Sequence, residues 1–119
     1  KGISSKVFQH IDILPSILSY LNFPNEHISF GKNIFKKETE LTYAINYHNG
    51  YQLISPNTFI KYNEDKEKII EVYNLKEDKL LENNIVNDSD SIKYLENKLM
   101  GFIQQYNNRM INNKLTFEN

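Results

Sequence analysis

Five apolar residues near the start of the chain recur in steps of three and four: Ile13, Leu14, Ile17, Leu18 and Leu21. This spacing predicts a helix over about 12–22 with one buried face. Asp12 stands where a helix cap is needed, and Pro15 suits the first turn because its missing N–H has no partner there. Asn22 and Pro24 are expected to end the helix.

Apolar and polar residues alternate from position 41 onwards, which is the period of a strand. The dipeptide Asn49-Gly50 then follows, a strong signal for a hairpin turn. Three more short apolar segments come after it, each bounded by turn residues: 51–55, 58–62 and 68–74. We therefore predict an antiparallel four-stranded meander over about 41–74, with one face covered.

Residues 75–90 show no sustained period and are expected to form an ordered connector. Helical spacing then returns in one apolar series: Ile92, Leu95, Leu99, Phe102, Ile103, Tyr106 and Met110. This series predicts a long helix over about 90–112, capped by Ser89 or Asp90. Gly101 inside it costs about 1 kcal/mol relative to Ala, so we expect a close packing contact there. The predicted class is α+β, with the long C-terminal helix packed on the sheet.

Composition narrows the possible functions. The 119 residues suit one domain with a modest core, and a net charge of −1 offers no electrostatic footprint for nucleic acid. The absence of cysteine excludes disulfides and thiolate chemistry, and no apolar run approaches the roughly 20 residues that span a bilayer. The chain begins "KGISSKVFQH" without Met and soon enters apolar sequence, so we expect it to be part of a longer chain.

No self-sufficient catalytic constellation is visible. The histidines His10, His27 and His48 have no i,i+4 pairing and no neighbouring Cys, so we predict no metal site. Ser4-Ser5 has no visible partner base. The carboxylates lie in predicted turns, where they are expected to be solvated: Glu38, Glu40, Glu64, Asp65, Glu67, Glu77 and Asp78. His10 alone stands at a turn into a helix, where α/β enzymes often place functional groups.

Several separated segments resemble the C-terminal part of bacterial sulfatase-like hydrolases, in the branch with lipoteichoic acid synthase-type phosphoglycerol transferases of the alkaline phosphatase superfamily. They are "HIDILPSILSYLNF" at 10–23, "SFGKNIF" at 29–35, "IIEVYNLKEDKLLENNIV" at 69–86 and "FIQQYNNRMINNKL" at 102–115. Together they cover nearly the whole chain, in the order the family has them.

The resemblance implies that residues 1–119 are a single C-terminal subdomain beside an upstream catalytic α/β domain. That domain would hold the nucleophile and a divalent metal (Ca, Mn, Mg or Zn), so no catalytic residue or metal ligand is carried over here. It would act on an anionic sulfate or phosphate ester, at the periplasmic or extracytoplasmic side of the bacterial cell envelope. His10 becomes a candidate for lining the substrate pocket, and Asp12 is assigned as the helix cap. The severed piece, itself soluble, is expected to be inert and able to dimerise.

A free-standing binding module is the alternative. The tyrosines and phenylalanines of the meander would then form a stacking platform on one sheet face. Alternating aromatic residues on one face are more typical of a core, and no basic groove accompanies them.

Overall fold

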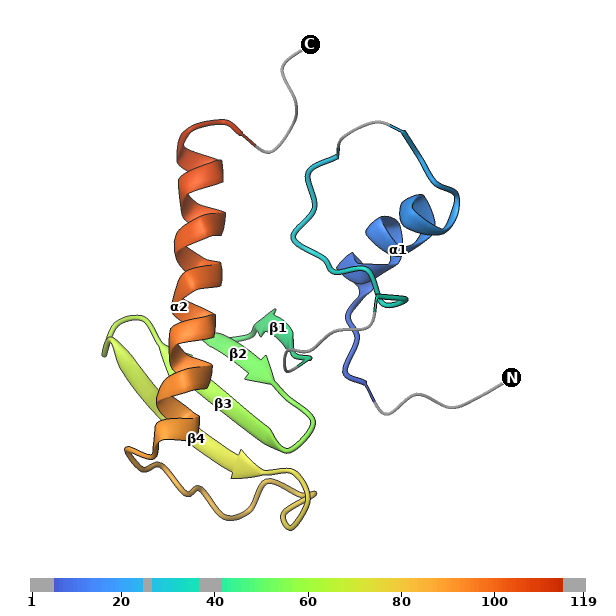
Figure 1. Ribbon diagram of the computed structural model, residues 1–119. Coiled ribbons are helices and arrows are strands. Elements are labelled where there is room, and N and C mark those ends of the chain that lie inside the picture. Colours follow the sequence, from blue (N-terminus) through green and yellow to red (C-terminus); the bar gives the residue numbers. More distant parts are fainter. Residues whose placement is uncertain (1–5, 25–26, 37–41, 115–119) are drawn as a thin grey trace.

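The computed structural model describes residues 6–24, 27–36 and 42–114. Its elements in chain order are η1 (His10–Asp12), α1 (Ile13–Tyr20), β1 (Ala44–Tyr47), β2 (Tyr51–Ile54), β3 (Thr58–Asn63), β4 (Lys68–Asn74) and α2 (Asp90–Ile111). The predicted α+β class is confirmed: an N-terminal helix, a four-stranded antiparallel sheet and a long C-terminal helix (Figure 1).

The sheet is a simple meander in the order β1-β2-β3-β4, and all its pairs are antiparallel. The turn between β1 and β2 depends on Gly50, which has φ +116°. A Cβ built there would lie 2.5 Å from the Tyr62 carbonyl oxygen, so this position requires glycine. The first predicted strand is shorter than expected, because β1 begins at Ala44, and Leu41 lies outside the described residues.

Helix α2 lies across one face of the sheet (Figure 1). The core between the two layers consists only of apolar side chains: Leu53, Ile60, Val72, Ile92, Leu95 and Leu99. Tyr43, Tyr51 and Tyr62 pack against this core, so the aromatic side chains of that face are largely core residues and not an open platform. Tyr47 is the exception on β1, with 60% of its surface exposed.

Gly101 does not make the close contact that we predicted. It is exposed on α2, and a Cβ built on it meets no atom within 4 Å. The buried face of α2 follows Ile92, Leu95 and Leu99, and position 101 points away from it. The glycine therefore has no packing reason within the described chain.

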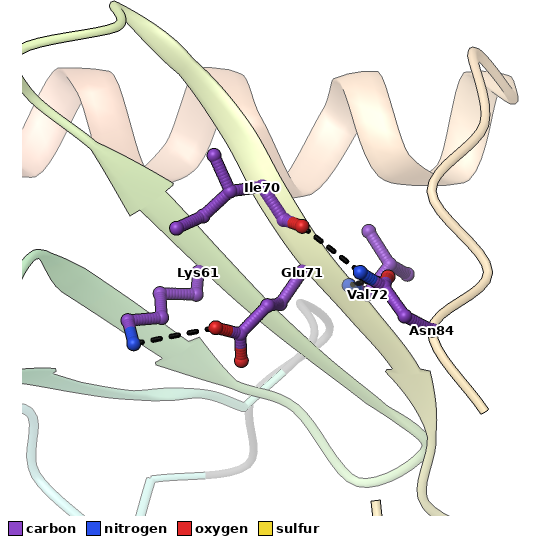
Figure 2. Close-up of polar contacts among 5 residues, drawn as sticks. All are labelled: Lys61, Ile70, Glu71, Val72 and Asn84. Atoms are coloured by element: carbon purple, nitrogen blue, oxygen red, sulfur yellow. Dashed lines mark hydrogen bonds and ion pairs between the residues drawn. The ribbon is translucent and has the colours of Figure 1, made fainter. Parts of the chain in front are cut away.

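The connector after β4 covers the outer edge of the sheet (Figure 2). The side-chain amide of Asn84 donates to the Ile70 carbonyl at 3.0 Å and accepts from the Val72 N–H at 3.0 Å. Ile85 N–H continues the pattern to the Val72 carbonyl at 2.9 Å. The unpaired N–H and C=O groups of an edge strand can pair with another chain. The Asn84 side chain bonds to two such groups of β4 and so protects this edge.

The sheet face opposite α2 is more polar. Lys61 and Glu71 form an ion pair at 3.3 Å on this face, in front of the strands in Figure 2, with α2 behind them. Beside it Phe59 and Tyr73 stand with ring centroids 5.8 Å apart. The alternation expected of a meander with one covered face is therefore present.

The apolar face of α1 is not buried, which corrects our prediction. Ile13, Leu14, Ile17 and Leu21 are 53, 58, 49 and 65% exposed, whereas Pro15 and Ser16 are buried. The reason is tertiary: α1 lies apart from the sheet and α2 (Figure 1), so its apolar stripe finds no partner among the described residues.

The end of α1 is where we predicted. Asn22 has φ +51°, its N–H bonds to the Ser19 carbonyl at 3.2 Å, and Phe23 N–H bonds to the Leu18 carbonyl at 2.9 Å. This pair of bonds around a left-handed residue is a Schellman motif, for which Asn is one of the preferred residues.

Candidate functional site

The segment around η1 is organised by a buried carboxylate. Asp12 is 5% exposed; its Oδ2 accepts a hydrogen bond from the Gln9 N–H at 3.0 Å and its Oδ1 accepts one from the Lys32 N–H at 2.8 Å. Asp12 does precede the first residue of α1, but its side chain makes no hydrogen bond to that helix. Asp12 is thus the N-cap residue of α1 by position, while its carboxylate closes the η1 turn and holds the loop.

Ser16 is the second polar anchor, and sequence reasoning missed it. It is 2% exposed, its hydroxyl donates to the Asp12 carbonyl one turn earlier, and it accepts the Ile34 N–H at 3.0 Å. Its signal was present in the Pro-Ser step of the quoted motif. A serine in mid-helix commonly bonds back to the carbonyl four residues before it, which leaves its oxygen free to accept from elsewhere.

Gly31 lets the loop approach the turn. A Cβ built on Gly31 would lie 1.9 Å from the carbonyl oxygen of Ile11, which no side chain tolerates. This close backbone contact is the reason for a glycine at position 31. The loop over 29–34 is thus locked against η1 and α1 through Asp12, Ser16 and Gly31.

His10 opens η1 and has an exposed side chain. It lines a shallow pocket together with Phe8, Ile13 and Ile34, next to the apolar surface of α1. The other histidines lie elsewhere, His27 in the loop after α1 and His48 in the turn between β1 and β2.

Within the described ranges, no group of three or more His, Asp or Glu is arranged to hold a metal ion. Of the predicted turn carboxylates, Asp78 accepts hydrogen bonds from the Asn83 and Glu82 N–H groups, at 2.7 and 3.0 Å. These bonds lower the pKa of Asp78 because they favour its charged form. Ser4-Ser5, Glu38 and Glu40 lie outside the described residues.

Many residues near His10 in the sequence have exposed apolar side chains. They are Phe8, Ile11, Ile13, Leu14, Ile17, Tyr20, Leu21, Phe23 and Phe35. Single exposed apolar residues are ordinary, but this many within 28 consecutive positions are typical of a surface that contacts another molecule or domain.

The loop after α1 ties this segment to the rest of the molecule through aromatic contacts. The Phe30 ring lies 5.8 Å from that of Phe102 and 5.5 Å from that of Tyr106, both on α2. The Lys32 ammonium lies 4.2 Å from the centre of the Tyr43 ring. The Gln9 side chain accepts the Ile45 N–H at 2.9 Å on the outer edge of β1. The orientation of α1 is thus set without use of its apolar stripe.

The fold and the site define an α+β unit with a helix held through buried polar side chains. No family model, curated protein or solved structure with which the chain was compared matches it. Through the ranges that the structure describes, none of the helices combines the length and the apolar character that crossing a bilayer demands.

Proposed function

We propose that the chain is the C-terminal subdomain of a metal-dependent enzyme resembling sulfatases and phosphoglycerol transferases. The whole enzyme would hydrolyse or transfer an anionic sulfate or phosphate ester at the bacterial cell envelope. The order of the four family-like segments, from 10–23 to 102–115, supports this proposal. The α+β fold of the chain is compatible with the proposal.

The outer surface of α1 carries the proposal. Ile13, Leu14 and Ile17 are about half exposed on a helix whose other side is fixed by the buried Asp12 and Ser16. The hydrogen bonds of Asp12 and Ser16 hold α1 with its apolar stripe towards solvent. In an isolated unit this arrangement is unfavourable, because exposed apolar area costs free energy in water. An upstream catalytic α/β domain that covers this stripe would remove the cost.

The chemistry then belongs to that upstream domain. A metal-activated hydroxyl would attack the ester there, and the cation would stabilise the developing charge. On this chain, His10 would stand at the rim of the interface and face the substrate side. Its imidazole suits an anionic ester, because it can donate a hydrogen bond in either protonation state.

The first test reads the coding sequence upstream of Lys1. We expect a domain with a Thr or Ser nucleophile and an Asp-His pair. The full-length protein should hydrolyse a phosphate or sulfate aryl ester only with a divalent cation. A reading frame without that nucleophile and pair, or one that starts at Lys1, would remove the enzyme interpretation.

The second test addresses the interface in the full-length protein. Ile17→Asp should lower activity at least tenfold, because a buried unpaired carboxylate disrupts an apolar contact. Met110→Asp is the matched control, since Ile17 and Met110 are both 49% exposed. Equal activities of the two variants would contradict docking through α1.

The same surface gives the isolated 119-residue chain a route to self-association. Sedimentation at increasing concentration should reveal a dimer that Ile17→Asp suppresses and Met110→Asp preserves. A dimer that survives Ile17→Asp would show that association uses another surface.

A further inference from the structure

A second concave site includes Ile11 of η1 in its lining. It is a groove between the β1–β2 hairpin, the end of β3, α2 and η1, lined by Ile11, Tyr47, Tyr51, Glu64, Phe102 and Tyr106. Nothing in the resemblance assigns a role to it. Below, "aromatic groove" refers to these six residues.

The rings of the aromatic groove meet at steep angles. Tyr47 and Tyr51 stand opposite each other in the β1–β2 register, with ring centroids 5.0 Å apart and planes at 75°. Phe102 and Tyr106 are one turn apart on α2 and nearly parallel, with planes at 6°. The edge-to-face contact of the two tyrosines leaves Tyr47 60% exposed at the side of the groove.

The electrostatics of the groove favour a cation. Aromatic faces carry partial negative charge and attract ammonium groups within about 6 Å. Glu64 adds a full negative charge to the groove lining, and its proximity raises the pKa of Tyr47. Burial, and then the charge of Glu64, raises the pKa of Tyr51. Among the described residues that line the groove, none is Lys, Arg or His.

Glu64 keeps capacity for a ligand. A carboxylate has about four acceptor sites, so Glu64 can accept hydrogen bonds from a ligand or attract its charge. Tyr47 itself is 60% exposed, so its ring face is accessible from solvent. We propose that the aromatic groove binds an alkylated ammonium group, held by the tyrosine faces and the Glu64 carboxylate.

The test compares choline with 3,3-dimethylbutan-1-ol, which has the same shape and no charge. Each is titrated into the 119-residue chain at constant ionic strength, with the backbone amides of Asn46 and Tyr51 followed by NMR. We expect choline to bind about five- to tenfold more tightly, since partly exposed cation–π sites discriminate by that order. Equal shifts with both ligands would overturn the proposal, because they would mean apolar contact alone.

Variants locate the site. Glu64→Gln should weaken choline binding about threefold and leave the alcohol unchanged, because only the Coulomb attraction is lost. Tyr47→Leu should weaken choline binding by a similar factor. Tyr94→Leu is the control, since Tyr94 is an exposed tyrosine of α2 outside the groove. A loss in Tyr94→Leu as large as in Tyr47→Leu would contradict the assignment.

A third titration with methyl α-glucoside separates the two kinds of ligand that aromatic side chains commonly take. Weaker binding of the glucoside than of choline supports the proposal. Tighter binding of the glucoside would assign the groove to sugars and overturn it.

Discussion

The sheet with α2 and the segment around α1 bury opposite kinds of residue. Between β2, β3, β4 and α2 the core side chains are all apolar, and Leu53, Ile60 and Leu99 are fully buried. Around α1 the buried residues are Asp12, Pro15 and Ser16, of which two are polar, while Ile13, Leu14 and Ile17 are about half exposed. The sheet and α2 are thus held by buried apolar side chains, whereas α1 is held mainly through buried polar ones.

The difference shows what each region depends on. Burial of apolar area is non-directional and stabilises the sheet and α2 in proportion to the surface removed from water. Hydrogen bonds from a buried carboxylate and hydroxyl are directional, and they place the loop at 29–34 relative to η1 and α1. The second arrangement fixes orientation while it leaves the apolar stripe of α1 free for another surface.

The largest expected change in the free energy of unfolding appears when two leucines, one from each region, are replaced by alanine. Leu99→Ala should lower the free energy of unfolding by about 2–5 kcal/mol, because it leaves a cavity in the core. Leu14→Ala, at a position 58% exposed, should change it by less than about 0.5 kcal/mol. Urea unfolding followed by circular dichroism measures both. Similar losses in the two variants would mean that α1 has a buried apolar face after all.

The polar anchor provides the next largest effect. Asp12→Ala leaves the Gln9 and Lys32 N–H groups without their acceptor and should cost about 1–3 kcal/mol. Hydrogen exchange should accelerate at these two amides and remain unchanged at Val72 in the sheet. Asp88→Ala, in the exposed connector, is the control. Exchange that accelerates uniformly through the sheet would show that the two regions unfold as one unit.

Closure of the β4 edge should have a smaller effect. Asn84→Ala removes two hydrogen bonds to the edge and should cost about 1–2 kcal/mol. It should also raise the tendency to aggregate, measured by light scattering, because an edge strand becomes available. Asn97→Ala, at an exposed position of α2, should lower neither stability nor solubility. An Asn84→Ala protein as stable as the wild type would refute this role.

Gly101→Ala should stabilise the protein by about 1 kcal/mol, because alanine is the better helix former and its Cβ meets no atom. Gly31→Ala should do the reverse, since its Cβ would collide with the Ile11 carbonyl. Thermal unfolding distinguishes the two. A destabilised Gly101→Ala protein would restore the close contact that the sequence suggested.

The smallest effect concerns pH and the connector. The pKa of Asp78 is lowered by the N–H groups of Asn83 and Glu82, so its ionised form favours the folded connector. This contribution is fully present above the unfolded pKa of about 3.9 and is lost as the pH falls through the lower folded pKa. An NMR titration of the Asp78 carboxyl should have its midpoint below about 3.9. Asp78→Asn should lose this pH dependence, and a midpoint at the ordinary value would contradict the hydrogen bonds.

Local signals in the sequence predicted most of the fold. The alternation after position 41 and the Asn49-Gly50 turn predicted the hairpin, and the spacing from Ile92 to Leu99 predicted the buried stripe of α2. These features depend on periodicity and on turn chemistry, which act over a few residues. The site was predicted less well, because Asp12 and Ser16 bond to a loop about 20 residues away.

The sequence by itself determined which segments are helices and strands, the left-handed residue Asn22 that follows α1, and the position of the β1–β2 turn. Only the tertiary structure decided that the predicted apolar stripe of α2 is covered and that of α1 is not. Burial of an apolar stripe such as that from Ile13 to Leu21 lowers the free energy, but the stripe does not specify which surface covers it. In this chain α2 meets the sheet, while α1 is held from its polar side and keeps its apolar stripe exposed.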